Sequence, residues 1–321
     1  MNYKPILIVH GEPNSIFLEI FFKTLKLKKF KSPLILICSK KILKFQMKKL
    51  KFKKGIKIIN PSLLNRIKLN NKMINIIDVD YKENLKFQKI NDKSNRYIKN
   101  CFKTSFKILK SGITNKLING PISKTSFLKK KYLGITEYLA KETKANQNAM
   151  LIYNKNLSVC PITTHLPLKS VVKNITKNKI MEKIILIDNF YKKFLGFKPK
   201  IVVLGLNPHC ESVNKINEDE KILKPTINYL SNKRINVDGP YPADTAFLKK
   251  NRKNIDVIVG MYHDQVLTPI KTLYEYDAIN ITLGLPFIRI TPDHGPNQKM
   301  LGQNKSNPLS LIRAIEFLEK N

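Results

Sequence analysis

Apolar residues along the chain fall into short continuous runs that alternate with longer amphipathic segments. Short runs bounded by polar or turn residues are typical of buried strands, and the longer segments have the spacing of surface helices. The predicted strands are Ile6–Val9, Leu34–Cys38, Ile56–Ile59, Ile74–Asp78, Lys116–Asn119, Met150–Tyr153, Val159–Thr163, Lys200–Leu204, Ile255–Val259 and Ala278–Thr282. The predicted helices are Ser15–Leu27, Lys40–Leu50, Asn91–Leu109, Thr176–Phe194, Glu218–Leu230 and Pro308–Glu319, the last capped by Asn307.

This alternation predicts an α/β fold in which helices cover both faces of a largely parallel sheet, an α/β/α arrangement. A chain of 321 residues is long enough for two such domains. We expect a first domain made of residues 1–125 and 271–321, and a second made of residues 126–270, so that the C-terminal helix returns to the first domain.

Composition narrows the class of protein. Hydrophobic residues make up 42% of the chain, which excludes a mainly disordered protein. No run approaches the roughly 18 apolar residues of a membrane span, and the first apolar run is too short for a secretion signal. The four cysteines are dispersed without a C-x-x-C pair, which argues against a disulfide framework or a zinc ribbon. We therefore expect a cytoplasmic protein with no membrane partner.

The net charge of +36 raises the question of a nucleic-acid partner. Only six of the 59 basic residues are arginine, the residue best suited to bidentate phosphate and base contacts. The excess lysine occurs together with abundant asparagine and isoleucine, as expected when the coding DNA is rich in A and T. This pattern favours a compositional bias of the coding DNA, rather than a nucleic-acid-binding surface, as the origin of the charge. The charge can still attract anionic substrates.

Three of the five histidines each follow a predicted strand. The pairs of strand and histidine are Val159–Thr163 with His165, Lys200–Leu204 with His209, and Ile255–Val259 with His263. Ligands of open α/β sheets collect beyond the carboxyl ends of the strands, so the three imidazoles can converge there. Three imidazoles that leave one coordination position open are typical of a catalytic divalent metal. A histidine that caps a turn explains each position equally well when it is taken singly, so both interpretations stay open at this point.

The two other histidines and the glycines carry less information. His294 follows an apolar run and either joins the same site or stabilises a turn, and His10 follows the first strand with either a structural or a functional role. The twelve glycines never occur as G-x-G, so neither the dinucleotide fingerprint nor a P-loop is present. A nucleotide cofactor, if used, must be bound in another way.

At its motifs the sequence resembles the 4-hydroxythreonine-4-phosphate dehydrogenases, a family of pyridoxal 5'-phosphate biosynthesis. The resemblance spans nearly the whole chain, and its motifs follow one another in the family's order. They are Gly11-Glu12-Pro13, Asn119-Gly120-Pro121-Ile122-Ser123-Lys124, Gly134-Ile135-Thr136-Glu137, Thr164-His165-Leu166-Pro167-Leu168, Gly205-Leu206-Asn207-Pro208-His209, Gly239-Pro240-Tyr241-Pro242-Ala243-Asp244-Thr245, Met261-Tyr262-His263-Asp264-Gln265, and Asn280 to Arg289.

The resemblance implies a metal- and NAD-dependent oxidation of 4-phosphohydroxy-L-threonine, with NADP as the alternative cofactor. It implies zinc, cobalt or magnesium, and a homodimer whose active sites lie in the cleft between the domains and take residues from both subunits. The implied metal ligands are His165, His209 and His263, and the implied substrate contacts are Thr136, Lys271, Asn280 and Arg289. Asp244 and Lys271 are our candidates for proton transfer.

Several positions depart from the family pattern. Ile135 stands where the family commonly has a histidine that contacts substrate, and an aliphatic side chain cannot donate that hydrogen bond. The segments after Glu12-Pro13, His209 and His294 also differ from the family's glycine-rich or small-residue continuations. Two functional alternatives follow: a dehydrogenase of a related acid, 4-phosphoerythronate or 4-phosphothreonate, and a basic nucleic-acid-binding protein that has lost catalysis.

Overall fold

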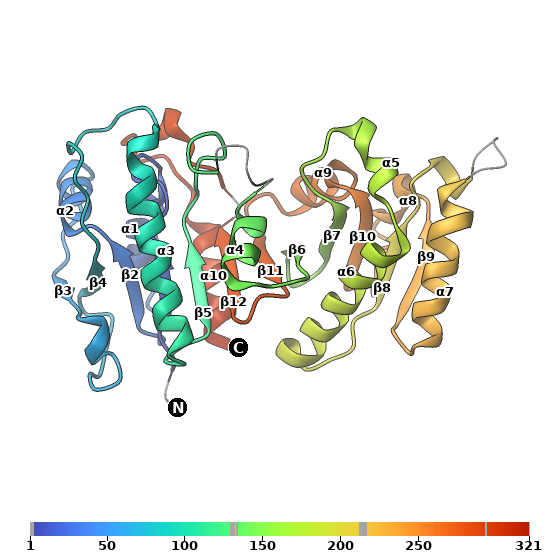
Figure 1. The fold of residues 1–321 in the computed structure, drawn as a ribbon, viewed down its shortest axis with the longest axis horizontal. Coiled ribbons are helices and arrows are strands. Elements are labelled where there is room, and N and C mark those ends of the chain that lie inside the picture. Colours follow the sequence, from blue (N-terminus) through green and yellow to red (C-terminus); the bar gives the residue numbers. More distant parts are fainter. Residues whose placement is uncertain (1–2, 129–131, 133, 212–216, 293, 321) are drawn as a thin grey trace. The chain divides into compact units, whose positions relative to one another are not determined.

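The structure is a computed structural model that describes residues 3–128, 132, 134–211, 217–292 and 294–320 (Figure 1). The chain divides into two compact units, Met1–Tyr138 with Pro286–Asn321, and Leu139–Leu285. The sequence placed these boundaries near residues 125 and 270. The difference at the second boundary has a structural cause, because the strand at residues 279–283 pairs with a strand of the second unit and stays with it.

The first unit contains a parallel sheet, in the order β3-β4-β2-β1-β5-β12. Its strands are β1 (Ile6–Val9), β2 (Leu34–Cys38), β3 (Ile56–Ile58), β4 (Ile74–Asp78), β5 (Lys116–Asn119) and β12 (Ile288–Pro292). Its helices are α1 (Phe17–Leu27), α2 (Lys40–Lys49), α3 (Asn95–Lys110) and α10 (Leu309–Lys320), while α4 (Ile135–Thr143) continues into the second unit.

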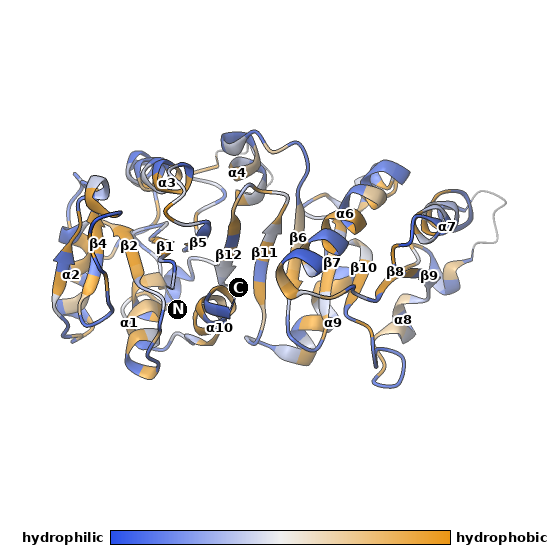
Figure 2. Cartoon of the chain, turned by 90° about the horizontal axis from the view of Figure 1, so that it is seen from below, coloured by the Kyte–Doolittle hydropathy of each residue, from blue (hydrophilic) through white to orange (hydrophobic). Residues whose placement is uncertain are grey.

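Helices lie on both faces of the first unit's sheet, with α1 and α10 on one face and α3 on the other (Figure 2). The central strand β1 is fully buried along its length, as expected for a parallel strand covered on both sides. At the start of α10 the side chain of Asn307 accepts a hydrogen bond from the backbone N–H of Leu309 at 2.9 Å. The predicted cap is therefore present.

The second unit contains a mixed sheet in the order β11-β6-β7-β10-β8-β9. β6 pairs antiparallel with β11 and β7, and the remaining neighbours are parallel. Its strands are β6 (Ala149–Tyr153), β7 (Ser158–Thr163), β8 (Ile201–Leu204), β9 (Val237–Tyr241), β10 (Val257–Tyr262) and β11 (Ile279–Leu283). Its helices are α5 (Val171–Asn174), α6 (Lys177–Phe190), α7 (Lys224–Asn232), α8 (Ala243–Ala246) and α9 (His263–Tyr274).

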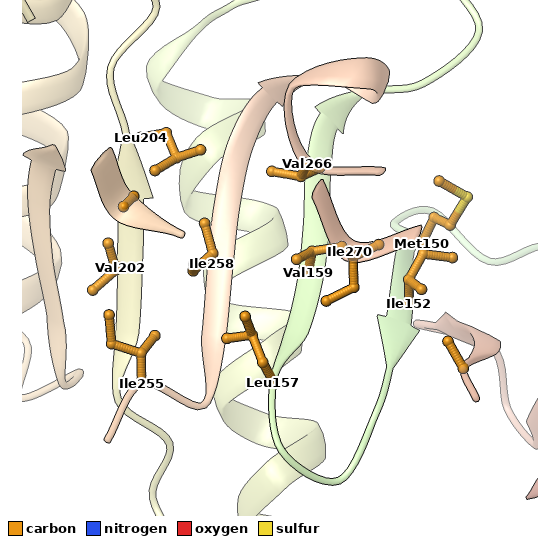
Figure 3. Close-up of a cluster of buried hydrophobic side chains, with 12 residues drawn as sticks. Met150, Ile152, Leu157, Val159, Val202, Leu204, Ile255, Ile258, Val266 and Ile270 are labelled. Atoms are coloured by element: carbon orange, nitrogen blue, oxygen red, sulfur yellow. The ribbon is translucent and has the colours of Figure 1, made fainter. Parts of the chain in front are cut away.

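The core of the second unit joins the sheet to α9 (Figure 3). Val159, Val202 and Ile258, from three neighbouring strands, form one buried cluster with Val266 and Ile270 of the helix. Burying a side chain of this size contributes about 1.5–3 kcal/mol, so the cluster fixes α9 on the strand ends that precede it.

The predicted α/β architecture is confirmed, and each predicted strand and helix is found. The periodicity did not predict β9, β12, α4 and α9, nor the short helices α5 and α8. Three of these elements carry residues that obscure the pattern: Gly239-Pro240 in β9, Arg289 in β12, and Pro269 inside α9. In the described part of the chain, no helix combines the length and apolar character needed to span a membrane.

Candidate active site

Three neighbouring parallel strands of the second unit, in the order β7-β10-β8, lead to the three predicted metal ligands. His165 follows β7, His263 is the first residue of α9 directly after β10, and His209 lies in a short turn, Pro208–Cys210, after β8. Each histidine follows a strand end, as the hydrophobic pattern predicts, and the pairing of the three strands is a finding of the structure. Their clustering needs separate evidence from the side chains.

His165 and His263 come together, with their ring centroids 5.7 Å apart. Nδ1 of His263 lies 2.6 Å from Oδ1 of the exposed Asp264 carboxylate. Because an ionised carboxylate can only accept, Nδ1 carries the proton in this pair. Nε2 is then the ring nitrogen that is left to face a metal ion, which is the usual orientation of a metal-binding histidine with a carboxylate partner.

His209 is exposed and has a left-handed backbone conformation, with φ of 57°, followed by Cys210 with φ of 61°. Across the ranges that the structure describes, no three His, Cys, Asp or Glu side chains form a group able to hold a metal ion. A single chain thus brings two of the three predicted ligands together. The side chains present are nevertheless of the type that a borderline metal such as zinc or cobalt prefers.

The turn that carries His209 is fixed by a buried carboxylate that the sequence analysis did not identify. Asp219 accepts hydrogen bonds from the backbone N–H of Leu206 at 2.7 Å and of Asn207 at 2.9 Å. Gln265 adds a second link, because its Nε2 donates to the carbonyl of Gly205 and its Oε1 accepts from the N–H of Met261. Asp219 lies in an acidic run, Glu218-Asp219-Glu220, which resembles a solvated helix start and gives no sign of burial.

The two candidate proton-transfer residues also belong to the second unit. Asp244 is exposed at the start of α8, and burial together with the charges of Asp219, Glu211 and Asp244 raises the pKa of the Cys210 thiol. Asp244 therefore lies close enough to the His209 turn to act on it electrostatically. Lys271, on α9, has its pKa lowered by burial, which favours the neutral amine that a general base requires.

The predicted substrate contacts are distributed over both units. Asn280 is half-buried on β11 in the second unit, whereas Thr136 on α4 and Arg289 on β12 belong to the first. Arg289 is fully buried, and burial lowers the pKa of its guanidinium to about 9 while the charge of Glu137 opposes that shift. The residue beside Thr136 thus supplies the counter-charge for Arg289.

The two remaining histidines lie in the first unit. His10 is fully buried, its Nδ1 lies 2.9 Å from the Tyr97 hydroxyl, and burial lowers its pKa to about 3. This environment favours the structural role over the functional one. The ring centroid of His294 lies 6.4 Å from that of Phe17, and its Nδ1 lies 3.0 Å from the carbonyl of Gly295.

Fold and site together define an α/β protein of the class that carries functional side chains, here two neighbouring imidazoles, beyond the carboxyl ends of parallel strands. Residues 29–318 match the family model described as pyridoxal phosphate biosynthetic protein PdxA, and the chain belongs to that family. The family expected from the sequence motifs is thereby confirmed.

Its relatives include dehydrogenases of two named phosphorylated acids. A 4-hydroxythreonine-4-phosphate dehydrogenase from Sulfurihydrogenibium sp. (strain YO3AOP1) is 39% identical, over 97% of this chain and 96% of that protein. A D-threonate 4-phosphate dehydrogenase from Pectobacterium atrosepticum is 33% identical, over 68% of each chain. The crystal structure of 4-hydroxythreonine-4-phosphate dehydrogenase from Klebsiella pneumoniae has a TM-score of 0.86 at 28% identity, over 99% of this chain and 98% of that one.

Proposed function

We propose that this protein is a 4-hydroxythreonine-4-phosphate dehydrogenase that oxidises 4-phosphohydroxy-L-threonine with NAD, NADP being the alternative cofactor. The family match over residues 29–318 carries the proposal. The pair His165 and His263 at the ends of adjacent strands supports it, because it supplies imidazole donors where the family's reaction needs a divalent ion.

His165, His209 and His263 would hold this ion, as zinc, cobalt or magnesium. Such an ion would supply Lewis-acid chemistry, lowering the pKa of the substrate hydroxyl and offsetting negative charge on the substrate during decarboxylation. Among these ions, the three imidazoles favour zinc or cobalt over magnesium, which prefers oxygen ligands.

The chain's own residues bind the substrate and move its protons. Arg289 and Thr136 bind the anionic end of the substrate, and Asn280 binds a polar group near the reacting carbon. Lys271 accepts the hydroxyl proton, since burial lowers its pKa and increases its neutral fraction. Asp244 exchanges a proton with the substrate after oxidation.

The reaction balances as an oxidation followed by a decarboxylation. The carbon that carries the hydroxyl loses a hydride to NAD, and the hydroxyl proton goes to Lys271. The resulting 3-oxo acid loses carbon dioxide, and a proton replaces it on the adjacent carbon. The product is 3-amino-2-oxopropyl phosphate.

We further propose that the enzyme is a cytoplasmic homodimer whose active sites draw residues from both subunits. One chain brings His165 and His263 within 5.7 Å while His209 stays outside any three-ligand group of the described residues. A histidine from a second copy of the chain would complete the ligand set. Sharing of ligands across a two-fold interface produces two identical sites in each dimer.

A second candidate function is the oxidation of a related acid, 4-phosphothreonate or 4-phosphoerythronate. Ile135 favours it, because an isoleucine at the start of α4 cannot donate the hydrogen bond of the family's usual histidine. The relative from Pectobacterium atrosepticum acts on such an acid by its name.

The deciding experiment measures NADH formation from 4-phosphohydroxy-L-threonine, D-threonate 4-phosphate and 4-phosphoerythronate, each with and without a chelator. The proposal expects the highest kcat/KM with the first substrate, loss of activity on chelation, and recovery when zinc or cobalt is added. Preference for either of the other acids would establish the second candidate. Full activity after chelation, or in His209→Ala, would overturn the metal-dependent reaction.

A further inference from the structure

Arg289 is the largest fully buried side chain among the described residues, and it is the second residue of β12. A guanidinium that is removed from water is costly unless charges and hydrogen bonds compensate it. Glu137 supplies an opposing charge. The structure therefore fixes a cation at one place in the first unit, and its orientation depends on the groups that bind it.

One of these groups is Asn119, the last residue of the adjacent strand β5. Its Oδ1 accepts a hydrogen bond from Nε of Arg289 at 2.7 Å and a longer one from the Thr291 hydroxyl at 3.3 Å. Its Nδ2 donates to the carbonyl of Gly120 at 2.8 Å. With donors on one side of the amide and an acceptor on the other, only one orientation of Asn119 satisfies all three contacts.

The Nε contact determines how the whole guanidinium is held. The group is planar and rigid, so fixing Nε relative to β5 fixes the plane and the direction in which both terminal nitrogens point. Recognition of a phosphate or carboxylate by arginine depends on that direction, because two parallel N–H groups must meet two oxygens. Asn119 is itself only 1% exposed, so it cannot turn away to bind solvent instead.

We propose that Asn119 is a positioning residue that orients Arg289 for the anionic group of the substrate, an inference that rests on the proposed substrate-binding role of Arg289. Asn119 belongs to the motif Asn119-Gly120-Pro121-Ile122-Ser123-Lys124, and its hydrogen bond to Arg289 gives this first position of the motif a function. It acts through Arg289 and does not touch the substrate.

Three substitutions separate this role from simple packing. Asn119→Ala removes the acceptor for Nε. Asn119→Asp keeps an oxygen acceptor at the same place but adds a negative charge. Thr291→Val is the matched control, because it removes the second donor to the same oxygen and leaves the contact with Arg289 intact.

Each variant is compared with the wild type in thermal unfolding, in kcat and KM for 4-phosphohydroxy-L-threonine, and in the inhibition constant of inorganic phosphate. We expect Asn119→Ala to raise KM and the phosphate inhibition constant about tenfold, with a smaller change in kcat, as on loss of a hydrogen bond to a charged group. Asn119→Asp should fall between wild type and Asn119→Ala, and Thr291→Val should match wild type in both constants.

The order of the variants decides the outcome. If Asn119→Asp binds phosphate more weakly than Asn119→Ala, charge and not orientation controls the site, and the inference is wrong. Unchanged KM and phosphate inhibition in a folded Asn119→Ala would also overturn it. If Asn119→Ala does not fold, Asn119→Asp is compared with Thr291→Val instead. Positioning is contradicted if these two variants bind phosphate equally and both bind it at least twofold more weakly than wild type. Absence of NADH formation by wild type would refute the proposed function, while phosphate binding, followed by calorimetry, would still test Asn119.

Discussion

At the scale of single residues, the pair His263 and Asp264 is the best-defined part of the proposed metal site. The carboxylate holds Nδ1 at 2.6 Å and so selects the tautomer whose Nε2 can bind an ion. We expect Asp264→Asn to weaken zinc binding roughly 10- to 100-fold, since the orientation and basicity of the ring both depend on this partner. Zinc affinity is measured by competition with a chromophoric chelator.

Asp238→Asn is the control for that measurement. Asp238 is also an exposed carboxylate of the second unit, but it bonds the backbone N–H of Gly239 and the hydroxyl of Tyr241 and no histidine. The zinc affinity of the Asp238→Asn variant should match that of wild type. Equal affinities for wild type and Asp264→Asn would remove the role of Asp264 in metal binding.

Lys271 gives a second prediction at this scale. Its pKa lies below the ordinary lysine value because the ammonium form is desolvated, so the neutral amine becomes available at lower pH. Activity should therefore rise with pH as Lys271 loses its proton. Lys271→Met should lower kcat by about 10²- to 10⁴-fold, the usual contribution of a general base.

Lys271→Arg is the matched control for the charge. Arginine keeps the positive charge but stays protonated throughout the accessible pH range. If Lys271 acts as a general base, Lys271→Arg should be as slow as Lys271→Met. Substantial activity in Lys271→Arg would mean that only the charge is needed and that the proton goes elsewhere.

At the scale of elements, the loop that leaves β1 contains a buried carboxylate. Glu12 is fully buried, and desolvation, partly offset by hydrogen bonds from Asn14 and Ser94, raises its pKa to about 7. Because the folded pKa is above the unfolded value of 4.5, its contribution to stability is complete below pH 4.5 and is lost as the pH rises through 7. The loss amounts to at most about 3 kcal/mol.

We expect Glu12→Gln to escape this loss. At pH 5 the free energy of unfolding of the variant, measured in urea, should equal that of wild type or lie below it. At pH 8 the difference between the two proteins should shift in favour of the variant. His10, in the same loop, has the opposite sign: burial lowers its pKa to about 3, so its contribution is present above pH 6.5 and is lost as the pH falls toward 3. A difference between Glu12→Gln and wild type that does not change between pH 5 and 8 would contradict the buried, titrating carboxylate.

Hydrophobic patterning predicted most elements, because a buried parallel strand is a continuous apolar run and a surface helix repeats its apolar positions. It could not predict which strands pair. The antiparallel pairing of β11 with β6 assigns residues 279–283 to the second unit, and nothing in the local sequence distinguishes this strand from the strands that pair in parallel. The same limit applies to α9, whose internal Pro269 predicts an interruption, although the buried Val266 and Ile270 hold the helix on the sheet.

Patterning also predicted part of the candidate site. The position of each histidine directly after a strand could be inferred from the hydrophobic pattern. The pairing that makes these three strands neighbours could not be inferred. The contacts that hold these residues could not, since they depend on side chains distant in sequence. Asp219 binds the turn of His209 across 12 residues, and Asn119 binds Arg289 across 170.

At the scale of the whole molecule, the net charge of +36 affects how substrate arrives. A phosphorylated acid is attracted by such a field, and salt screens the attraction. We expect kcat/KM to fall roughly tenfold when added potassium acetate shortens the Debye length from about 30 Å to about 10 Å, while kcat changes little. A kcat/KM that does not respond to salt would show that the charge has no part in substrate capture.

The same charge allows a test of the nucleic-acid alternative. Retention on duplex DNA that weakens steeply with salt, together with no NADH from any of the three acids, would support that class of protein over the enzyme. The proposed enzyme should form NADH from at least one of these acids and should not be retained on duplex DNA. The two hypotheses therefore predict different outcomes in both measurements.

The strongest test of the proposed dimer uses two inactive variants. His209→Ala and His263→Ala should each be inactive as pure proteins, because each loses one of the three ligands. If each site takes His209 from one subunit and the pair His165 and His263 from the other, a mixed dimer has one site with all three histidines and one site with a single histidine. Random exchange of subunits makes half of the dimers mixed, so the mixture should recover about one quarter of wild-type activity.

The control is a mixture of His165→Ala with His263→Ala. These two rings lie 5.7 Å apart in one chain, so both substitutions act on ligands that the same subunit supplies. Each site of their mixed dimer then lacks one histidine, and no activity should return. Equal recovery in both mixtures would contradict this division of the ligands, and failure of the first mixture despite subunit exchange, followed by mass spectrometry, would place all three histidines within one subunit.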